Sequence, residues 1–283
     1  MTTTIRRRLA NGAALGAMYA AAVAALLPLG LVLLYTVVNG LPAVARVEFF
    51  VNVERPVGIP GAGVAHAIAG TLIIVGIASL LAVPIGVAGG VFLGEFDASR
   101  LAGLVRLTAD VLVGAPSIAI GLFAYAAVVV PLHHFSALSA SFALAILMLP
   151  IVVRTTDGAL ALIPAGLRES GVALGLPRWK VALRLILPAA IPGVVTGALL
   201  AMARAAGETA PLLFTAFGNR IFNLDPLRPM SALSLIVFHD ALTPYEELQR
   251  QAWGAALVLV VLVLIVNLLS RWALRRQIGR AAT

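Results

Sequence analysis

Long apolar segments constrain the fold of this chain more than any other feature of its sequence. The first, 13–38, contains no charged residue and exceeds the roughly 20 residues that an α-helix needs to cross the hydrocarbon core of a bilayer. A helix suits that environment because it satisfies its backbone hydrogen bonds within the segment. We therefore predict an all-α, polytopic membrane protein with six transmembrane helices. These helices are expected at 13–38, 65–93, 107–131, 136–153, 188–210 and 251–269.

The composition agrees with a membrane protein and excludes several functions. Hydrophobic residues make up 61% of the chain, against roughly 45–50% in an ordinary soluble domain. There is no cysteine, which excludes disulfides, thiolate metal sites and a cysteine nucleophile. The net charge of +8 would suggest nucleic acid as a partner of a soluble protein. Here we expect no nucleic acid, because membrane proteins carry an excess of Lys and Arg in their cytoplasmic parts.

The distribution of Lys and Arg predicts the orientation of the helices. With the N-terminus in the cytoplasm, 13 of the 20 Lys and Arg residues lie on the cytoplasmic side and 5 on the other, with Arg154 and Arg204 at or in the membrane. This bias favours two cytoplasmic termini and external segments at 39–64 and 211–250. The basic start before the first apolar run resembles a signal peptide, but the length of that run favours a retained helix.

Glycine and proline predict where the spans pack closely and where one of them bends. Gly86, Gly90 and Gly94 repeat every four residues on one helix face, a spacing that lets helices approach closely in lipid. Gly114-Ala115-Pro116 interrupts the third span, which we expect to be kinked or broken there.

A polar island separates the fourth and fifth spans. Only 11% of the chain is charged, yet five charged residues fall within 168–184. We expect a short helix at 167–174, a break at Gly175-Leu176-Pro177 and a second helix at 179–187, because glycine ends helices and proline disfavours helix in the residue before it. Two interpretations remain open: a cytosolic loop that is merely helical, or a docking element for a soluble partner.

Charged residues within the spans are candidates for a functional site. Arg204 and Glu208 are four residues apart, so they can pair on one helix face. They form either a structural ion pair or part of a polar pathway, in which the forked guanidinium would suit an oxyanion. Arg154 closes the fourth span and either snorkels to the interface or lies at the mouth of the same pathway. Asp157 is close enough in sequence to pair with Arg154.

Several common motifs are missing from the sequence. The single lysine, Lys180, is not part of a P-loop, and the chain contains neither HExxH nor GxSxG. We therefore expect a non-catalytic protein with no cofactor of its own, driven by a partner or an ion gradient if it moves a solute. His133 and His134 are adjacent with no further ligand nearby, so no metal site is expected.

The polar island resembles the EAA loop of the permeases of ATP-binding cassette (ABC) importers. In that family Glu-Ala-Ala, a glycine and Ile-x-Leu-Pro recur at fixed spacing. Glu169, Gly175, Leu187 and Pro188 fall on the corresponding positions, whereas two small residues replace the alanines and Leu185 replaces the isoleucine. The family places this loop, as coupling helices, in a groove of the ATPase subunit. The resemblance therefore implies a role for these four residues in ATPase coupling.

Four further segments resemble the phosphate permeases of this family, the PstA group: 66–72, 115–125, 149–156 and 203–214. The resemblance implies a type I importer (MetI-like) fold in the bacterial inner membrane. In that group, residues at positions matching Arg154, Arg204 and Glu208 are implicated in phosphate transport, which agrees with the oxyanion argument.

The resemblance also implies partners and a domain organisation. The partners would be a second, PstC-like permease, two PstB-like ATPase subunits that hold ATP and magnesium, and a periplasmic or lipid-anchored PstS-like phosphate-binding protein. The domains would be an N-terminal helix with an external loop at 1–64, a type-1 transmembrane domain at 65–271 with the coupling loop 166–188, and a basic cytoplasmic tail at 272–283.

Other functions stay open at this point. Permeases for another oxyanion, such as sulfate or molybdate, share the EAA loop. The chain could instead act mainly as a signalling scaffold that relays phosphate status to a sensor kinase. A gradient-driven secondary transporter is disfavoured, because we see no convincing internal repeat of spans.

Overall fold

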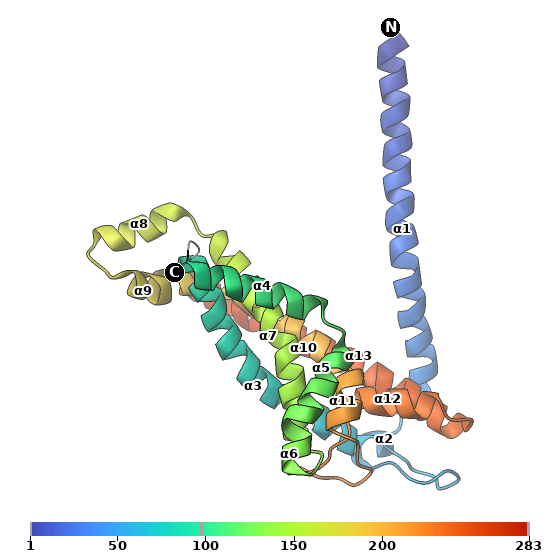
Figure 1. Ribbon diagram of the computed structural model, residues 1–283. Coiled ribbons are helices and arrows are strands. Elements are labelled where there is room, and N and C mark those ends of the chain that lie inside the picture. Colours follow the sequence, from blue (N-terminus) through green and yellow to red (C-terminus); the bar gives the residue numbers. More distant parts are fainter. Residues whose placement is uncertain (1, 97–98, 282–283) are drawn as a thin grey trace.

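The computed structural model describes residues 2–96 and 99–281, which form a helical bundle (Figure 1). The long helices are α1 (Thr2–Val44), α3 (Ala65–Glu95), α7 (Ala137–Ala161), α10 (Leu187–Gly207) and α13 (Glu246–Ala281). The shorter α-helices are α2 (Glu48–Val51), α4 (Arg100–Gly114), α5 (Ser117–Ala124), α6 (Val130–Leu132), α8 (Ala165–Ala173), α9 (Arg178–Val181), α11 (Ala210–Thr215) and α12 (Leu233–Ala241). Two π-helical turns lie at Tyr125–Val129 and Ala182–Ile186. The predicted all-α class is confirmed.

Five of the predicted spans are single helices long and apolar enough to cross a membrane. The third span differs, because α4 and the helical run 117–132 bend by 106° relative to each other. Counting this bent pair as one span gives six. The predicted interruption is confirmed, and it is a sharp corner. Pro116 accounts for it, since Ala115 before it is extended, with ψ of 135°.

The start of α4 corrects the sequence prediction, which began the third span at residue 107. The helix begins at Arg100, because the Oγ of Ser99 accepts a hydrogen bond from the backbone N–H of Ala102 and caps the first turn. Arg106 therefore lies on a helix, which fixes the direction of its side chain relative to α7.

α7 lies at the centre of the bundle, with 67% of its most apolar stretch buried, against 6% for α1. α3 packs against it along the predicted glycine face. A Cβ added at Gly86 would lie 2.7 Å from the Cβ of Val152, so the observed approach of the two helices requires glycine. The same face pairs Gly90 with Thr156 and Gly94 with Leu160. The prediction that these glycines pack helices together is confirmed.

α10 packs on a different face of α7, again through glycines. Gly193 lies against Ala159, and Gly197 lies against Thr155. Because the residue numbers of the two contacts run in opposite directions, α7 and α10 are antiparallel. This register allows the position of a residue on α7 along the helix axis to be compared with that of a residue on α10.

α1 extends away from the bundle (Figure 1). Its residues from 6 to 35 are all exposed. Only its C-terminal part packs on α13, where Gly40 contacts Trp253 and the ring of Tyr35 meets that of Trp253 edge-on, with centroids 5.1 Å apart. The helix also continues to Val44, so the external loop that was predicted to begin at residue 39 begins six residues later.

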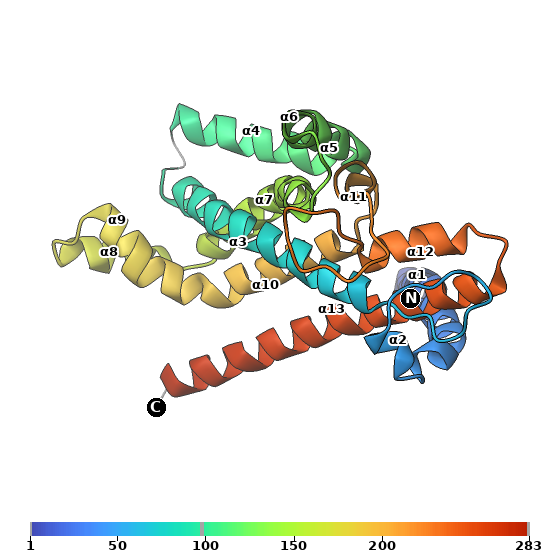
Figure 2. The ribbon, with the colours of Figure 1, turned by 90° about the horizontal axis from the view of Figure 1, so that it is seen from below.

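The two ends of the bundle carry different elements. Figures 1 and 2 show α8 and α9 projecting at one end, whereas α2 and α12 lie at the opposite end. At the latter end the stretch after α11 is docked on the start of α7: the N–H groups of Ala137 and Leu138 donate to the carbonyls of Arg228 and Pro226, at 3.0 and 2.9 Å. The predicted external segment 211–250 is therefore an ordered cap on the bundle.

Candidate functional site

Arg204 and Glu208 form the ion pair that the sequence predicted. The Nε of Arg204 lies 3.3 Å from Oε1 of Glu208. The helical setting differs from the prediction, because α10 ends at Gly207 and Glu208 is extended, with φ of −74° and ψ of 127°. The fifth span thus ends three residues earlier than predicted, and the carboxylate reaches back to the last turn of the helix.

The start of α12 holds this break in place. The Oγ of Ser234 donates to the carbonyl of Glu208 at 3.1 Å, and the Oγ1 of Thr209 donates to the carbonyl of Ser234 at 3.5 Å. The first bond satisfies the carbonyl of Glu208, just beyond the end of α10, and the second joins Thr209 to the backbone of α12. Glu208 is therefore positioned by the end of α10 and the start of α12, and its ion pair with Arg204 positions the guanidinium.

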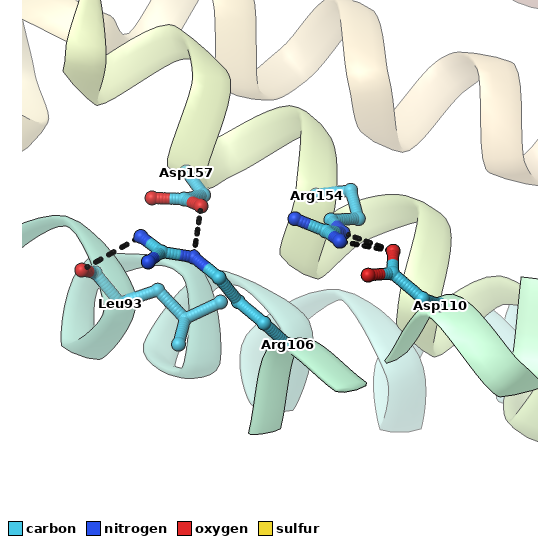
Figure 3. Close-up of polar contacts among 5 residues, drawn as sticks. All are labelled: Leu93, Arg106, Asp110, Arg154 and Asp157. Carbon is cyan, nitrogen blue, oxygen red and sulfur yellow. Dashed lines mark hydrogen bonds and ion pairs between the residues drawn. The ribbon is translucent and has the colours of Figure 1, made fainter. Parts of the chain in front are cut away.

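Arg154 pairs with a carboxylate that the sequence analysis missed (Figure 3). Its Nε donates to Oδ1 of Asp110 on α4 at 2.8 Å, and its Nη2 contacts the same oxygen. The predicted pairing of Arg154 with Asp157 is wrong. Asp157 instead accepts from Nε of Arg106 at 3.3 Å (Figure 3). The physical reason is that α4 runs alongside α7 and offers an acid and a base four residues apart, so both pairs form between helices.

The sequence did hold a signal for Asp110. It is a carboxylate inside the predicted third span, which is otherwise free of charge from 107 to 131. Such a charge is costly in lipid and usually has a partner. Two arginines near the membrane, Arg154 and Arg106, were available as that partner.

The register of α7 and α10 gives the relative height of the two arginines. Arg154 is next to Thr155, which contacts Gly197. Arg204 is seven residues beyond Gly197, which corresponds to about 10 Å along the helix axis at 1.5 Å per residue. The bundle therefore presents two guanidinium groups at different heights, each neutralised by a carboxylate.

Both guanidinium groups remain accessible in this chain. The side chains of Arg154 and Arg204 are 35% and 44% exposed. A guanidinium has five N–H donors. Among the described residues, Arg204 makes one side-chain hydrogen bond, to Glu208, so most of its donors can bind a ligand. Arrangements of this kind bind oxyanions, because the forked donors match paired oxygens.

The polar island folds as two short helices that reverse the chain. α8 ends in a Schellman motif: the N–H of Leu176 bonds to the carbonyl of Gly171, and that of Gly175 to the carbonyl of Val172. Gly175 has φ of +79°, a conformation that favours glycine. The predicted break is confirmed at the predicted residue.

The second helix of the island differs from its prediction. It was expected as a separate element at 179–187, but α9 continues through a π-helical turn at Ala182–Ile186 into α10. Pro188 has no N–H to donate to the preceding turn, and the wider π turn accommodates this loss without ending the helix. The second helix of the island is therefore continuous with the fifth span.

The predicted coupling residues take different places in this island. Glu169 is exposed on α8, and Pro188 is exposed at the start of α10. Leu187 is partly buried and packs with the cluster around Leu160 and Ile186. Leu174 and Trp179, at the tip, are 80% and 57% exposed. The island thus presents apolar and charged side chains at the end of the bundle opposite α12.

Comparisons with known proteins agree with this arrangement. A family model described as "Binding-protein-dependent transport system inner membrane component" matches residues 86–281. The phosphate transport system permease protein PstA of Yersinia pestis is 40% identical over 241 residues, covering 85% of this chain and 81% of that protein. The protein of the same name from Xylella fastidiosa (strain Temecula1) is 41% identical over 274 residues, covering 96% and 95%.

A solved structure supports the fold alone. The MetNI methionine ABC transporter, in an inward-facing conformation, matches with a TM-score of 0.64 and 20% identity over 78% of this chain and 96% of that chain. Fold and family together define a multi-pass inner-membrane component of a bacterial binding-protein-dependent transport system with a MetI-like permease fold. Within this class, the chain belongs to the PstA family.

Proposed function

We propose that this chain is the permease subunit of an ATP-driven phosphate importer and forms half of its transmembrane phosphate pathway. The observation that carries the proposal is the pair of guanidinium groups of Arg154 and Arg204, which lie at two heights and are each held by a carboxylate. The curated relatives, which are phosphate permeases by name, support the choice of anion.

The chemistry of the two sites suits phosphate. Its oxygens can accept paired N–H groups from a guanidinium in a fork-like geometry. Asp110 and Glu208 balance the positive charge while no anion is bound, and an anion in the pathway competes with them. The two sites differ by about 10 Å in height along the helix axis, and phosphate passes from Arg204 to Arg154.

The orientation follows from the excess of Lys and Arg on one side of the membrane. We assign the end with α8 and α9 to the cytoplasm, the end with α2 and α12 to the outside, and both termini to the cytoplasm. The 13 Lys and Arg residues on the side assigned to the cytoplasm, against 5 on the other side, support this assignment. Arg204 then lies nearer the outside and Arg154 nearer the cytoplasm.

The proposed importer contains further subunits. We assign to this chain a second, PstC-like permease, two PstB-like ATPase subunits and a PstS-like phosphate-binding protein. The chain itself is non-catalytic and holds no cofactor, since ATP and magnesium belong to the ATPase. The binding protein docks at the outer end, and the loop from Glu169 to Pro188 receives the movement of the ATPase and passes it to the helices, so that the pathway alternates its access.

The test is uptake by the reconstituted wild-type complex in proteoliposomes that contain ATP. Phosphate, sulfate and molybdate are offered separately, each with and without the binding protein. The proposal expects ATP-dependent phosphate uptake that needs the binding protein. Uptake of sulfate or molybdate in place of phosphate would keep the permease function and overturn the substrate. Uptake driven by a proton or sodium gradient without ATP would overturn the proposal as a whole.

A further inference from the structure

Arg168 lies where the ends of three helices meet. It belongs to the first half of α8, and its guanidinium makes three contacts. The Nε lies 3.2 Å from Oε1 of Glu95, the last residue of α3. The Nη1 and Nη2 donate to the carbonyls of Ile163 and Leu160, at 3.3 and 3.0 Å, where α7 ends. One side chain therefore bonds α8 to the ends of α3 and α7.

The helix termini make this position favourable for a cation. The last carbonyls of a helix lack partners within the helix and carry a partial negative charge. Arg168 donates to the carbonyl of Leu160 in the last turn of α7 and to that of Ile163 just beyond this helix, and it neutralises the carboxylate at the end of α3. The pair is partly buried, since the side chain of Arg168 is 27% exposed and that of Glu95 is 11% exposed. The contacts thus have a fixed geometry that a freely solvated pair would lack.

The helices that Arg168 joins to α8 also contact the candidate pathway. α3 and α7 pack tightly along the glycine face, and α7 carries Arg154. α7 is also joined to α4 by the ion pairs of Arg106 with Asp157 and of Arg154 with Asp110 (Figure 3). A displacement of α8 that reaches α3 and α7 therefore reaches the residues around Arg154.

The other attachments of α8 are less directional. Gly171 of α8 rests against the side chains of Val181 and Leu185, and Leu167 packs in the apolar cluster around Leu160. Apolar contacts of this kind have no preferred hydrogen-bond geometry and permit sliding. Among the described residues, the hydrogen bonds of Arg168 are the side-chain contacts with defined direction between α8 and the ends of α3 and α7.

We propose that Arg168 is the positioning residue that makes α8 move as one body with α3 and α7, and that Glu95 is its acidic partner. The inference rests on the proposed function of the loop in ATPase coupling. A lysine cannot replace this arginine, because an ammonium group lacks the planar fork that reaches a carboxylate and two carbonyls at once.

The first experiment compares Arg168→Lys with Arg178→Lys in the full complex in proteoliposomes. Arg178 is the matched control, since it is an exposed arginine of the same loop and both changes keep the charge. We expect Arg168→Lys to assemble with the ATPase and keep its basal activity, while phosphate transported per ATP hydrolysed falls roughly tenfold, a typical size for a coupling between sites. Glu95→Gln should act in the same direction, and the double variant should not add to it. An unchanged transport ratio, or a loss of ATPase binding, would overturn the proposal.

A second readout does not depend on the substrate. The chain has no cysteine, so spin labels can be placed at two exposed positions, Leu174→Cys directly after the last residue of α8 and Leu80→Cys on α3. In the otherwise unaltered complex, the distance distribution should stay the same when ATP and vanadate trap the closed ATPase. In Arg168→Lys it should shift or broaden. Two results would contradict the proposal: a change in the label distance when the unaltered complex is trapped, or an unchanged distance distribution when Arg168→Lys is trapped. The expected label response in a complex that fails to import phosphate would overturn the proposed substrate alone.

Discussion

At the residue scale, Asp110 determines whether Arg154 is free to bind an anion. Its side chain is 54% exposed, and an ion pair that exposed adds at most about 1 kcal/mol to stability. We expect Asp110→Asn to leave the melting temperature of the complex nearly unchanged. Because the neutral amide competes less well for the guanidinium, phosphate should be held more tightly, so that both KM and the maximal uptake rate fall by roughly fivefold, the equivalent of about 1 kcal/mol.

The matched control is Asp225→Asn, whose carboxylate pairs with Arg228 in the stretch that caps the opposite end of the bundle. Its uptake kinetics should equal those of the wild type. If Asp110→Asn changes neither KM nor the maximal rate, Asp110 is only a structural partner of Arg154.

Asp240 provides a prediction for pH. It is buried in α12, and burial, with the nearby charge of Glu54, raises its pKa from 3.8 to about 7, while Arg220 opposes the rise. A raised carboxyl pKa means that the folded state binds the proton more readily than the unfolded state. The stability gained from this proton is therefore fully present below 3.8 and is lost as the pH rises to about 7.

Replacing this carboxyl by an amide tests the direction in which Asp240 changes stability with pH. Asp240→Asn should flatten the melting temperature of the complex between pH 4 and 7 and raise it at pH 8, where the native carboxylate is charged and buried. Differential scanning fluorimetry across this range measures both effects, with Asp225→Asn as an exposed control. A melting temperature that falls at pH 8 would contradict the assigned pKa shift.

Sequence reasoning found one ion pair of the site and missed the other for a physical reason. Arg204 and Glu208 are close along the chain, so their spacing alone brought them together. Arg154 had an acidic neighbour at Asp157, but its partner lies on α4, whose direction depends on the corner at Pro116 and on packing against α7. Spacing along one helix contains no information about a neighbouring helix.

At the scale of the elements, the close contact of α3 with α7 gives a test of packing. A Cβ at Gly90 would collide with the Cβ of Thr156, whereas one at Gly76 of the same helix would meet nothing within 4 Å. We expect Gly90→Ala to destabilise the protein by roughly 1–3 kcal/mol, the usual cost of overpacking a tight contact. Gly76→Ala should have little effect. Thermal melting of the purified complex compares the two, and equal melting temperatures would contradict the packing described.

Most elements were predictable, because apolar length and breakers act locally. Five spans, the glycine face of α3 and the turn at Gly175 follow from nearby residues. The corner of 106° does not, since Gly114-Ala115-Pro116 permits a kink or a break and packing decides between them. The merging of α9 with α10 was missed for a related reason: the π turn before Pro188 has no strong sequence signature.

At the scale of the whole molecule, the chain leaves large apolar and charged surfaces uncovered. α1 exposes its apolar residues from 6 to 35, and the guanidinium groups of Arg154 and Arg204 are both partly exposed. Lipid accounts for apolar exposure on a membrane helix, whereas accessible charged groups call for a polar surface opposite them. A second permease facing these arginines supplies that surface in the proposed assembly. The sequence gives the length of each span but not this arrangement, which depends on partners outside the chain.

The central claim, that Arg204 lies on the phosphate pathway, is tested most directly by uptake in proteoliposomes with the complete complex. Arg204→Gln is compared with the wild type and with Arg250→Gln, which removes an exposed arginine paired four residues away with Glu246. We predict that Arg204→Gln abolishes ATP-dependent phosphate uptake, while assembly and basal ATPase activity persist and Arg250→Gln transports normally. Normal uptake by Arg204→Gln would contradict the claim and leave Arg204 and Glu208 as a structural ion pair.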